Sequence, residues 1–360
     1  MRILGCNAFE NNPIKLYTSA RIIKKMNSKP LIYLAPFQGI TTYTYREVYT
    51  KHFGGVDKLF TPFFTGIQKP NSLAKRAYEF NFSTQNNVEV VPQMLSKDAD
   101  EITRFANFCD KKGFKEVNWN LGCPYPRVAN KKRGSGMLPY PDMVGEILNQ
   151  VIPNISIKFS IKCRLGYFSE DEIISLMRVY NSFNISELTI HARIGKQLYT
   201  GDVNIEAFKK VIAISTIPMV YNGDVFTIDD FKKYNDGLFE INNWMIGRGI
   251  LVDPFLPMKI KEQVDSNLVE QGERVYKFIT DLYLAYRKKN NDKLQAIGAI
   301  KELWGYLAYS FSNPQKALNK IKKTSSFDEY EEAVAFVFKE VAWLGSEGRL
   351  YEKKSKSHNI

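Results

Sequence analysis

Cysteine and histidine are scarce in this chain. Its 360 residues include four cysteines and three histidines. The cysteines form no C-x-x-C pair and their spacing fits no zinc site, so we expect no bound metal; they are Cys6, Cys109, Cys123 and Cys163. Thiols that are so few and so scattered favour a reducing compartment, and we therefore expect a cytoplasmic protein.

Long apolar runs and one familiar nucleotide motif are also missing. No apolar run approaches the roughly 20 residues needed to cross a bilayer, so we expect no membrane association. Residues 1–30 lack a continuous apolar segment and make a poor signal peptide, and we interpret them as an N-terminal extension. No G-x-G-x-x-G follows the first predicted strand, which counts against a Rossmann dinucleotide site.

The chain does contain a regular alternation of short apolar runs with amphipathic stretches. Each run is bounded by turn residues, as expected of parallel strands buried on both faces. About eight β-α units in roughly 230 residues predict a TIM barrel, whereas the alternative, a doubly wound sheet, rarely needs eight units. The predicted strands are 31–35, 57–61, 88–94, 116–120, 155–163, 187–191, 217–222 and 243–247.

Helical patterns separate most of these runs and then replace them. A helix is predicted over 98–112, Ser169 and Glu172 form a potential capping box, and Thr227 is a potential cap. Beyond about Pro254 no strand-like alternation remains, and three amphipathic helices predict a small all-helical domain; they cover 268–289, 293–311 and 328–344. The predicted organisation is an extension (1–30), a catalytic barrel (31–262), a helical domain (263–346) and a polar tail (347–360).

Charge points to an anionic partner, and one loop combines charge with a thiol. The chain has 50 Lys and Arg against 38 Asp and Glu, a net charge of +12, which suits a polyanion such as nucleic acid. The stretch 117–141 runs from a buried strand to a helix, carries Cys123, and continues through the basic run Lys131-Lys132-Arg133. A thiol in a strand-to-helix loop of a barrel can act as an acid or a nucleophile, although a single cysteine is more often only a small buried residue.

Two groups of residues at predicted strand ends favour a flavin nucleotide. Asn222-Gly223-Asp224 and Gly247-Arg248-Gly249 follow the last two strands, where barrels commonly bind phosphate. A second group of polar side chains faces the same barrel mouth and would be satisfied by a planar heteroaromatic ring: Gln93, Asn120, Lys162 and His191. A phosphate beside such a ring describes flavin mononucleotide (FMN).

These motifs resemble the tRNA-dihydrouridine synthase family. The resemblance rests on six segments in family order: LAPFQGITTYTYR (34–46), NLGCPYPRVANKKRGSGML (120–138), IKCRLG (161–166), IHARIGKQLYTGDVN (190–204), YNGD (221–224) and MIGRG (245–249). A helical C-terminal domain is also a family feature. The chain departs from the family at Phe37, where Met is usual, at Ala192, and at Asn204-Ile205, which blurs the subfamily.

The resemblance implies an oxidoreductase that reduces the C5=C6 bond of D-loop uridines in tRNA, with FMN as cofactor and NADPH as reductant. It implies Cys123 as the general acid. The implied FMN contacts are Ala35, Pro36, Phe37, Gln93, Lys162, His191, Asn222, Gly223, Asp224, Gly247 and Arg248. The implied substrate contacts are Asn120, Arg193, Gln197 and Tyr199. We expect tRNA as the partner and a monomeric protein.

Two other functions are compatible with parts of the sequence. An FMN barrel acting on a small molecule, similar to dihydroorotate dehydrogenase, would use the same strand ends but would leave the basic run without a role. A non-catalytic RNA-binding protein would use the basic surfaces but would leave the polar groups at the strand ends unexplained.

Overall fold

The computed structural model describes residues 29–67, 73, 78–80, 88–238, 240–262 and 267–348. Most of the predicted extension and most of the predicted polar tail lie outside these residues. Within the described part of the chain, no helix has the length and apolar character needed to span a bilayer.

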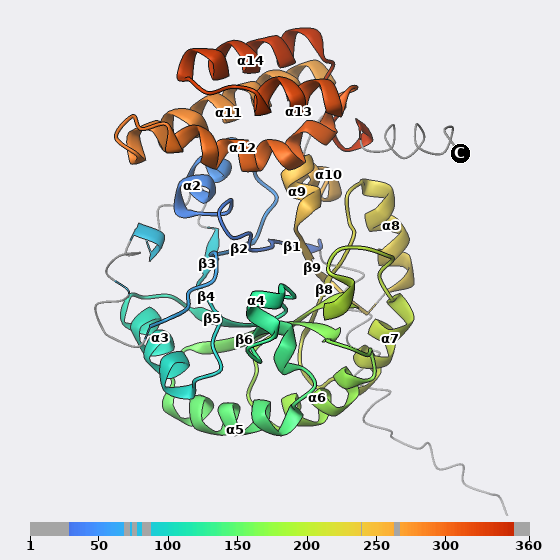
Figure 1. Cartoon of the computed structure of the whole chain (residues 1–360). Coiled ribbons are helices and arrows are strands. Elements are labelled where there is room, and N and C mark those ends of the chain that lie inside the picture. Colours follow the sequence, from blue (N-terminus) through green and yellow to red (C-terminus); the bar gives the residue numbers. More distant parts are fainter. Residues whose placement is uncertain are drawn as a thin grey trace, which may run out of the picture.

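The predicted TIM barrel followed by helices is confirmed. All strand pairs are parallel, and the last strand, β9, pairs with the first, β1, with Leu34 opposite Ile246. Figure 1 shows the strands arranged as a ring with helices around it. The strands are β1 (Leu31–Leu34), β2 (Lys58–Phe60), β3 (Glu89–Val91), β4 (Gln93–Met94), β5 (Glu116–Leu121), β6 (Lys158–Gly166), β7 (Leu188–Ile194), β8 (Met219–Asn222) and β9 (Asn243–Ile246).

The predicted strand 88–94 is divided into two pieces. Pro92 separates β3 from β4, since proline has no backbone N–H to donate to a sheet. The first piece pairs with β2 and the second with β5, so the divided strand completes the ring. The eight predicted strands therefore appear as nine segments, and Gln93 begins the second piece.

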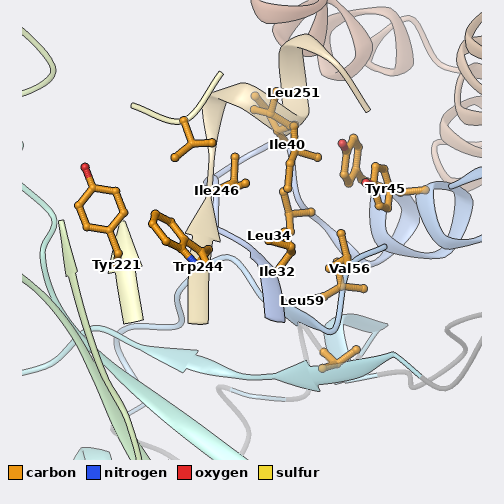
Figure 2. Packing of buried hydrophobic residues seen from close by; sticks show 14 of the residues in the cluster. Ile32, Leu34, Ile40, Tyr45, Val56, Leu59, Tyr221, Trp244, Ile246 and Leu251 are labelled. Atoms are coloured by element: carbon orange, nitrogen blue, oxygen red, sulfur yellow. The ribbon is translucent and has the colours of Figure 1, made fainter. Parts of the chain in front are cut away.

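Alternating side chains along the strands build two cores. On β1, Tyr33 belongs to a small cluster inside the ring together with Phe60, Val91, Val220 and Met245. Ile32 and Leu34 belong instead to the large cluster between the ring and its helices. Figure 2 shows this outer layer, with Ile32 and Leu34 from β1 near Trp244 and Ile246 from β9. This alternation is the inside-outside pattern expected of a barrel strand.

The helices of the outer layer begin close to the predicted positions. The predicted helix 98–112 is α3, with Asp98 as its cap, and Thr227 caps α8 in a reciprocal box with Asp230. The predicted pairing of Ser169 with Glu172 is present, because the Glu172 carboxylate accepts the Ser169 backbone N–H at 3.1 Å. The helix itself, α6, begins two residues later than predicted, at Glu172, with Asp171 rather than Ser169 in the cap position. The outer helices are α2 (Tyr43–His52), α3 (Ala99–Lys111), α5 (Pro141–Val151), α6 (Glu172–Tyr180), α7 (Ile205–Ile214) and α8 (Ile228–Gly237).

Short helical turns follow several strands. They lie mainly in the loops after β5, β7 and β9, on the side of the ring where the strands end. They are α4 (Pro126–Ala129), η4 (Gly134–Met137), η5 (Ile152–Asn154), η6 (Gly195–Gln197), α9 (Arg248–Val252) and α10 (Leu256–Ile260).

The C-terminal part is helical and packs on one side of the barrel, above α2, α9 and α10 in Figure 1. The three predicted helices correspond to α11 (Leu268–Lys289), α12 (Gln295–Leu307, continued by η7, Ala308–Ser310) and α14 (Phe327–Glu340). A fourth, α13 (Pro314–Lys322), was missed; its signals were Asn313 as a cap and Pro314 in the first turn. A last turn, η8, covers Gly345–Glu347.

The helical part and the barrel share one apolar core. The ring of Phe278 on α11 lies 6.0 Å from Tyr45 and 6.4 Å from Tyr49 on α2, and 5.0 Å from Phe53. A buried carboxylate adds a polar link, because Asp253 accepts hydrogen bonds from the Lys259 ammonium and from backbone N–H groups after α14 and α9. The helices are therefore fixed relative to the barrel.

Candidate active site

A cavity of about 860 Å³ lies at the ends of the strands. It falls in the size range of cofactor and ligand pockets. Most of the predicted site residues line it, although they come from seven different strands or the loops that follow them. They are Ala35, Pro36, Phe37, Gln93, Asn120, Cys123, Lys162, His191, Tyr199, Asn222, Gly223, Asp224, Gly247 and Arg248.

A chain of side-chain amides crosses the base of this cavity. The Gln93 amide nitrogen donates to Asn118 Oδ1 at 2.8 Å, and its oxygen accepts from Asn120 Nδ2 at 2.7 Å. Asn118 donates in turn to the Ser160 hydroxyl at 2.8 Å. Because each amide is held by its neighbour, Gln93 and Asn120 have fixed orientations at the cavity wall.

The Cys123 thiol projects from the loop after β5. Asn120 Oδ1 accepts the backbone N–H groups of Gly122 and Cys123, both at 3.0 Å, and the Ser135 hydroxyl donates to the Cys123 carbonyl at 3.1 Å. Burial raises the pKa of the Cys123 thiol, and the Tyr125 backbone and nearby cations only partly offset this effect. The thiol is therefore protonated at neutral pH and can donate a proton.

Lys162 and His191 face the cavity from β6 and β7. Burial, assisted by the neighbouring Arg164, lowers the pKa of Lys162 to about 8. Burial also lowers the pKa of His191 well below its ordinary value, and the surrounding cations Arg164, Lys162, Arg193 and Arg248 act in the same direction. The site therefore combines a lysine close to its titration point with a neutral imidazole.

Asp224 joins two arginines beside the glycines at the ends of β8 and β9. It pairs with Arg193 through both carboxylate oxygens and with Arg248 Nη2 at 2.6 Å. The Asp224 carboxylate thereby fixes the Arg248 guanidinium, which lies on the cavity wall.

The glycines leave room that a side chain would fill. A Cβ at Gly247 would lie 3.1 Å from the Phe37 ring, and one at Gly223, whose φ is +152°, would lie 2.8 Å from Val203. An open backbone beside an arginine can approach a phosphate closely. Gly223, Gly247 and Arg248 at one end of the cavity suit a phosphate, and the polar side chains of Gln93, Lys162 and His191 suit a flavin ring.

The family model for dihydrouridine synthase matches residues 33–345, which is most of the chain. The chain belongs to the dihydrouridine synthase family. Membership in this family identifies it as an enzyme.

Curated dihydrouridine synthases resemble the chain over most of their length. It is 27% identical over 281 residues to tRNA-dihydrouridine synthase B of Pasteurella multocida, covering 77% of this chain and 79% of the relative. It is 25% identical over 320 residues to tRNA-dihydrouridine(16) synthase of Neisseria meningitidis serogroup B, covering 85% and 94%.

Among solved structures, histamine dehydrogenase from Rhizobium sp. 4-9 superposes on this dihydrouridine synthase with a TM-score of 0.50 at 9% identity. The match covers 69% of this chain and 48% of that one. At this identity the likeness supports the barrel fold alone.

Two residues that the family resemblance assigned to substrate do not line the cavity of this dihydrouridine synthase. Arg193 is fully buried behind it, where it also donates to the carbonyls of Thr200 and Gly201. The Gln197 side chain bridges the Ile194 backbone N–H and the Asp202 carbonyl. Both hold the 193–202 loop, so any effect on substrate would be indirect, through Tyr199.

Three further residues line the cavity although the sequence assigned them no role in the site. Arg164, two residues after Lys162, donates to the Gly122 carbonyl at 3.1 Å and the Ile194 carbonyl at 2.9 Å, and its guanidinium lies over the Tyr199 ring. Its period-two spacing from Lys162 predicts that both side chains point to the same face of the strand, and the structure confirms that both line the cavity. Glu302 and Tyr306 on α12 complete the wall from the helical part, and no local motif marks them.

The described residues contain no group of three or more histidine, cysteine, aspartate or glutamate side chains arranged to hold a metal. Among the cysteines that the structure describes, Cys109 and Cys163 are buried free thiols away from the cavity wall, and Cys123 lines it.

Proposed function

We propose that this enzyme is an FMN-dependent tRNA-dihydrouridine synthase that reduces D-loop uridines with NADPH. One observation carries the proposal. The protonated thiol of Cys123 lines the same cavity as two groups of residues. One group, Gly223, Gly247 and Arg248, suits a phosphate, and the other, Gln93, Lys162 and His191, suits a flavin ring. The names of the curated relatives support tRNA as the substrate.

The two ends of the cavity would hold the two ends of the cofactor. Gly223, Gly247 and Arg248 would hold the phosphate, while Gln93, Lys162 and His191 would contact the ring, with Ala35, Pro36 and Phe37 packed against it. Asn222 and Asp224 would support the phosphate end, since Asn222 donates to the Met245 carbonyl and Asp224 holds Arg248. When bound, FMN would supply to uracil C6 the hydride that NADPH provides.

The side chains of the protein would supply the rest of the chemistry. Cys123 would donate its proton to C5 of the uracil as the general acid. Asn120 fixes the backbone of the Cys123 loop and lies on the cavity wall, where it would also contact the base. The Lys162 ammonium would stabilise negative charge that develops near it during reduction.

The decisive experiment uses purified protein, FMN, NADPH and tRNA that carries no modifications, with each dihydrouridine mapped by position. We expect product at one or two D-loop positions. Flavin binding and NADPH oxidation without tRNA product would instead favour a small-molecule substrate, and activity on a free pyrimidine would identify one. Protein that binds no FMN would favour the non-catalytic RNA-binding function.

The same assay tests the thiol. We expect Cys123→Ala to retain flavin, measured by its absorbance, and to lose at least a hundredfold in tRNA turnover, because general acid catalysis contributes about 10² to 10⁴. Cys109→Ala is the matched control, since that thiol is buried on α3 away from the cavity. Full turnover by Cys123→Ala would remove this residue from the mechanism.

A further inference from the structure

Exposed aromatic side chains gather on the loops that surround the cavity mouth. Phe168, the most exposed at 60%, follows β6, while Tyr125 at 47% and Tyr140 at 40% follow β5. Tyr199, which lines the cavity itself, is also 40% exposed. Exposed apolar surface that is grouped at one end of a barrel marks a candidate binding surface.

Each exposed ring is paired with a cation. Lys132 Nζ lies 4.1 Å from the Tyr140 ring centroid, and Arg127 lies 6.0 Å from that of Tyr125. Lys196, from the loop after β7, lies 5.4 Å from Phe168 and 5.3 Å from Tyr167. We name this surface the aromatic rim and define it as Tyr125, Arg127, Lys132, Tyr140, Phe168 and Lys196.

The loops that carry the rim are fastened to one another and to the Cys123 loop. The Lys196 backbone N–H donates to the Tyr167 carbonyl at 3.0 Å. A Cβ on Gly195 would lie 2.2 Å from the Tyr167 ring and 2.8 Å from the Ser135 hydroxyl, so these three loops are in close contact. Ser135 in turn holds the Cys123 carbonyl. The rim therefore has a fixed position relative to the proposed catalytic thiol.

The charge of the rim suits an anionic partner. Residues 123–140 contain four basic residues, Arg127 and Lys131-Lys132-Arg133, and no acidic residue. Arg133 belongs to this basic run, and its Nε is buried without a hydrogen-bond partner among the described residues. The nearby Glu172 carboxylate is occupied by backbone N–H groups.

We propose that the aromatic rim binds unpaired RNA nucleotides next to the target uridine, stacking their bases on Phe168, Tyr140 and Tyr125 while the cations contact phosphates. This inference rests on the proposed function, because it assumes an RNA substrate. Rings stack on any base, whereas a duplex keeps its bases stacked internally, so the rim selects single-stranded segments. It thereby favours a uridine in a loop over one in a stem.

The test measures binding of the full-length protein to unmodified tRNA, and to a single-stranded oligoribonucleotide and its duplex. We expect Phe168→Leu and Tyr140→Leu each to weaken binding to tRNA and to the single strand by about tenfold. Binding of the duplex should be unchanged. Phe168→Trp should restore the affinity, because it restores a stacking surface.

Two controls separate stacking from other effects. Ile214→Ala alters an apolar side chain that is 43% exposed at the end of α7, on the opposite side of the barrel, and should change nothing. Lys132→Ala and Lys196→Ala should each reduce the slope of log binding constant against log salt concentration by about 1, because each removes one phosphate contact. Phe168→Leu should leave this slope unchanged. Circular dichroism and melting temperature confirm folding of each variant.

Unchanged tRNA affinity in the Phe168→Leu/Tyr140→Leu double variant would overturn the inference. Equal weakening for duplex and single strand would also overturn it. Wild-type protein that binds tRNA but forms no dihydrouridine would count against the proposed function instead, so the two failures are distinguishable.

Discussion

Individual side chains of the cavity are poised for chemistry at a cost in stability. Lys162 is the clearest case, because burial lowers its pKa from an ordinary 10.5 to about 8. In the unfolded chain the amine binds its proton more tightly than in the folded protein. Folding is therefore penalised below about pH 8, and the penalty is relieved as the pH rises toward 10.5.

We predict that Lys162→Met raises the stability of the cofactor-free protein at pH 7 by ~2 kcal/mol while abolishing tRNA reduction. The difference between variant and wild type should shrink as the pH rises from 8 to 10.5, since the lysine then becomes neutral in both states. Thermal denaturation of both proteins across this pH range measures the stability difference. Lys158→Met, at the exposed start of β6, is the matched control and should show no such trend.

Asp224 holds a buried charge in place. We predict that Asp224→Ala destabilises the protein by about 3–5 kcal/mol, because it leaves Arg193 buried without its carboxylate. Chemical denaturation measures the effect, and Asp229→Ala, an exposed carboxylate on α8, should cost less than about 1 kcal/mol. The double variant Arg193→Met/Asp224→Ala should recover part of the loss; equal or greater damage in the double variant would contradict this account.

At the scale of elements, the loop after β5 is built so tightly that its glycines control the position of the thiol. Gly134 has φ +55°, and a Cβ there would lie 2.7 Å from the Cys123 carbonyl and 3.0 Å from its Cβ. An added methyl group must therefore displace Cys123, although the residues proposed to bind FMN lie on other strands.

We predict that Gly134→Ala lowers tRNA turnover at least tenfold while FMN content stays close to that of wild type. Gly54→Ala is the control, because a Cβ there meets nothing within 4 Å. Flavin absorbance and single-turnover product formation provide the two readouts. Turnover equal to wild type in Gly134→Ala would mean that the loop tolerates displacement.

Elements with strong periodic patterns could be predicted from the sequence, and elements whose limits depend on distant contacts could not. Short apolar runs bounded by turn residues identified every barrel strand, and Pro92, visible in the sequence, marks the point where one of them divides. Helix α13 was missed because its nine residues bury only Ala317 and Ile321, too weak a pattern to stand out.

The candidate site shows the same division. Residues at strand ends were predictable, because parallel strands bring their ends to one face. Tyr306 was not, since it reaches the cavity from α12 only through packing of the helical part. The place of Arg193 behind the wall also depends on its tertiary partner Asp224, which lies 31 residues away.

At the scale of the whole molecule, barrel and helices share one apolar cluster, so we expect them to unfold together. We predict one cooperative thermal transition. Phe278→Ala should destabilise both parts by about 3–5 kcal/mol, because its ring packs between α11 and α2. Tyr276→Ala, on the same helix but 41% exposed, is the matched control and should have a smaller effect.

Differential scanning calorimetry with near-ultraviolet circular dichroism measures this transition. Hydrogen exchange of barrel and helical peptides shows whether both respond to Phe278→Ala. Two separate transitions, or exchange that changes only in the helices, would indicate two independent folding units.

The pairing of β1 with β9 also has a consequence for synthesis of the protein. Leu31 bonds into a ladder opposite Asn243, so the first strand made must wait for a partner roughly 200 residues later. At 5–20 residues per second, the ribosome needs on the order of 10–40 s to deliver that partner. During this interval the nascent chain exposes an open strand edge, and chaperones that bind such edges would protect it until the ring closes.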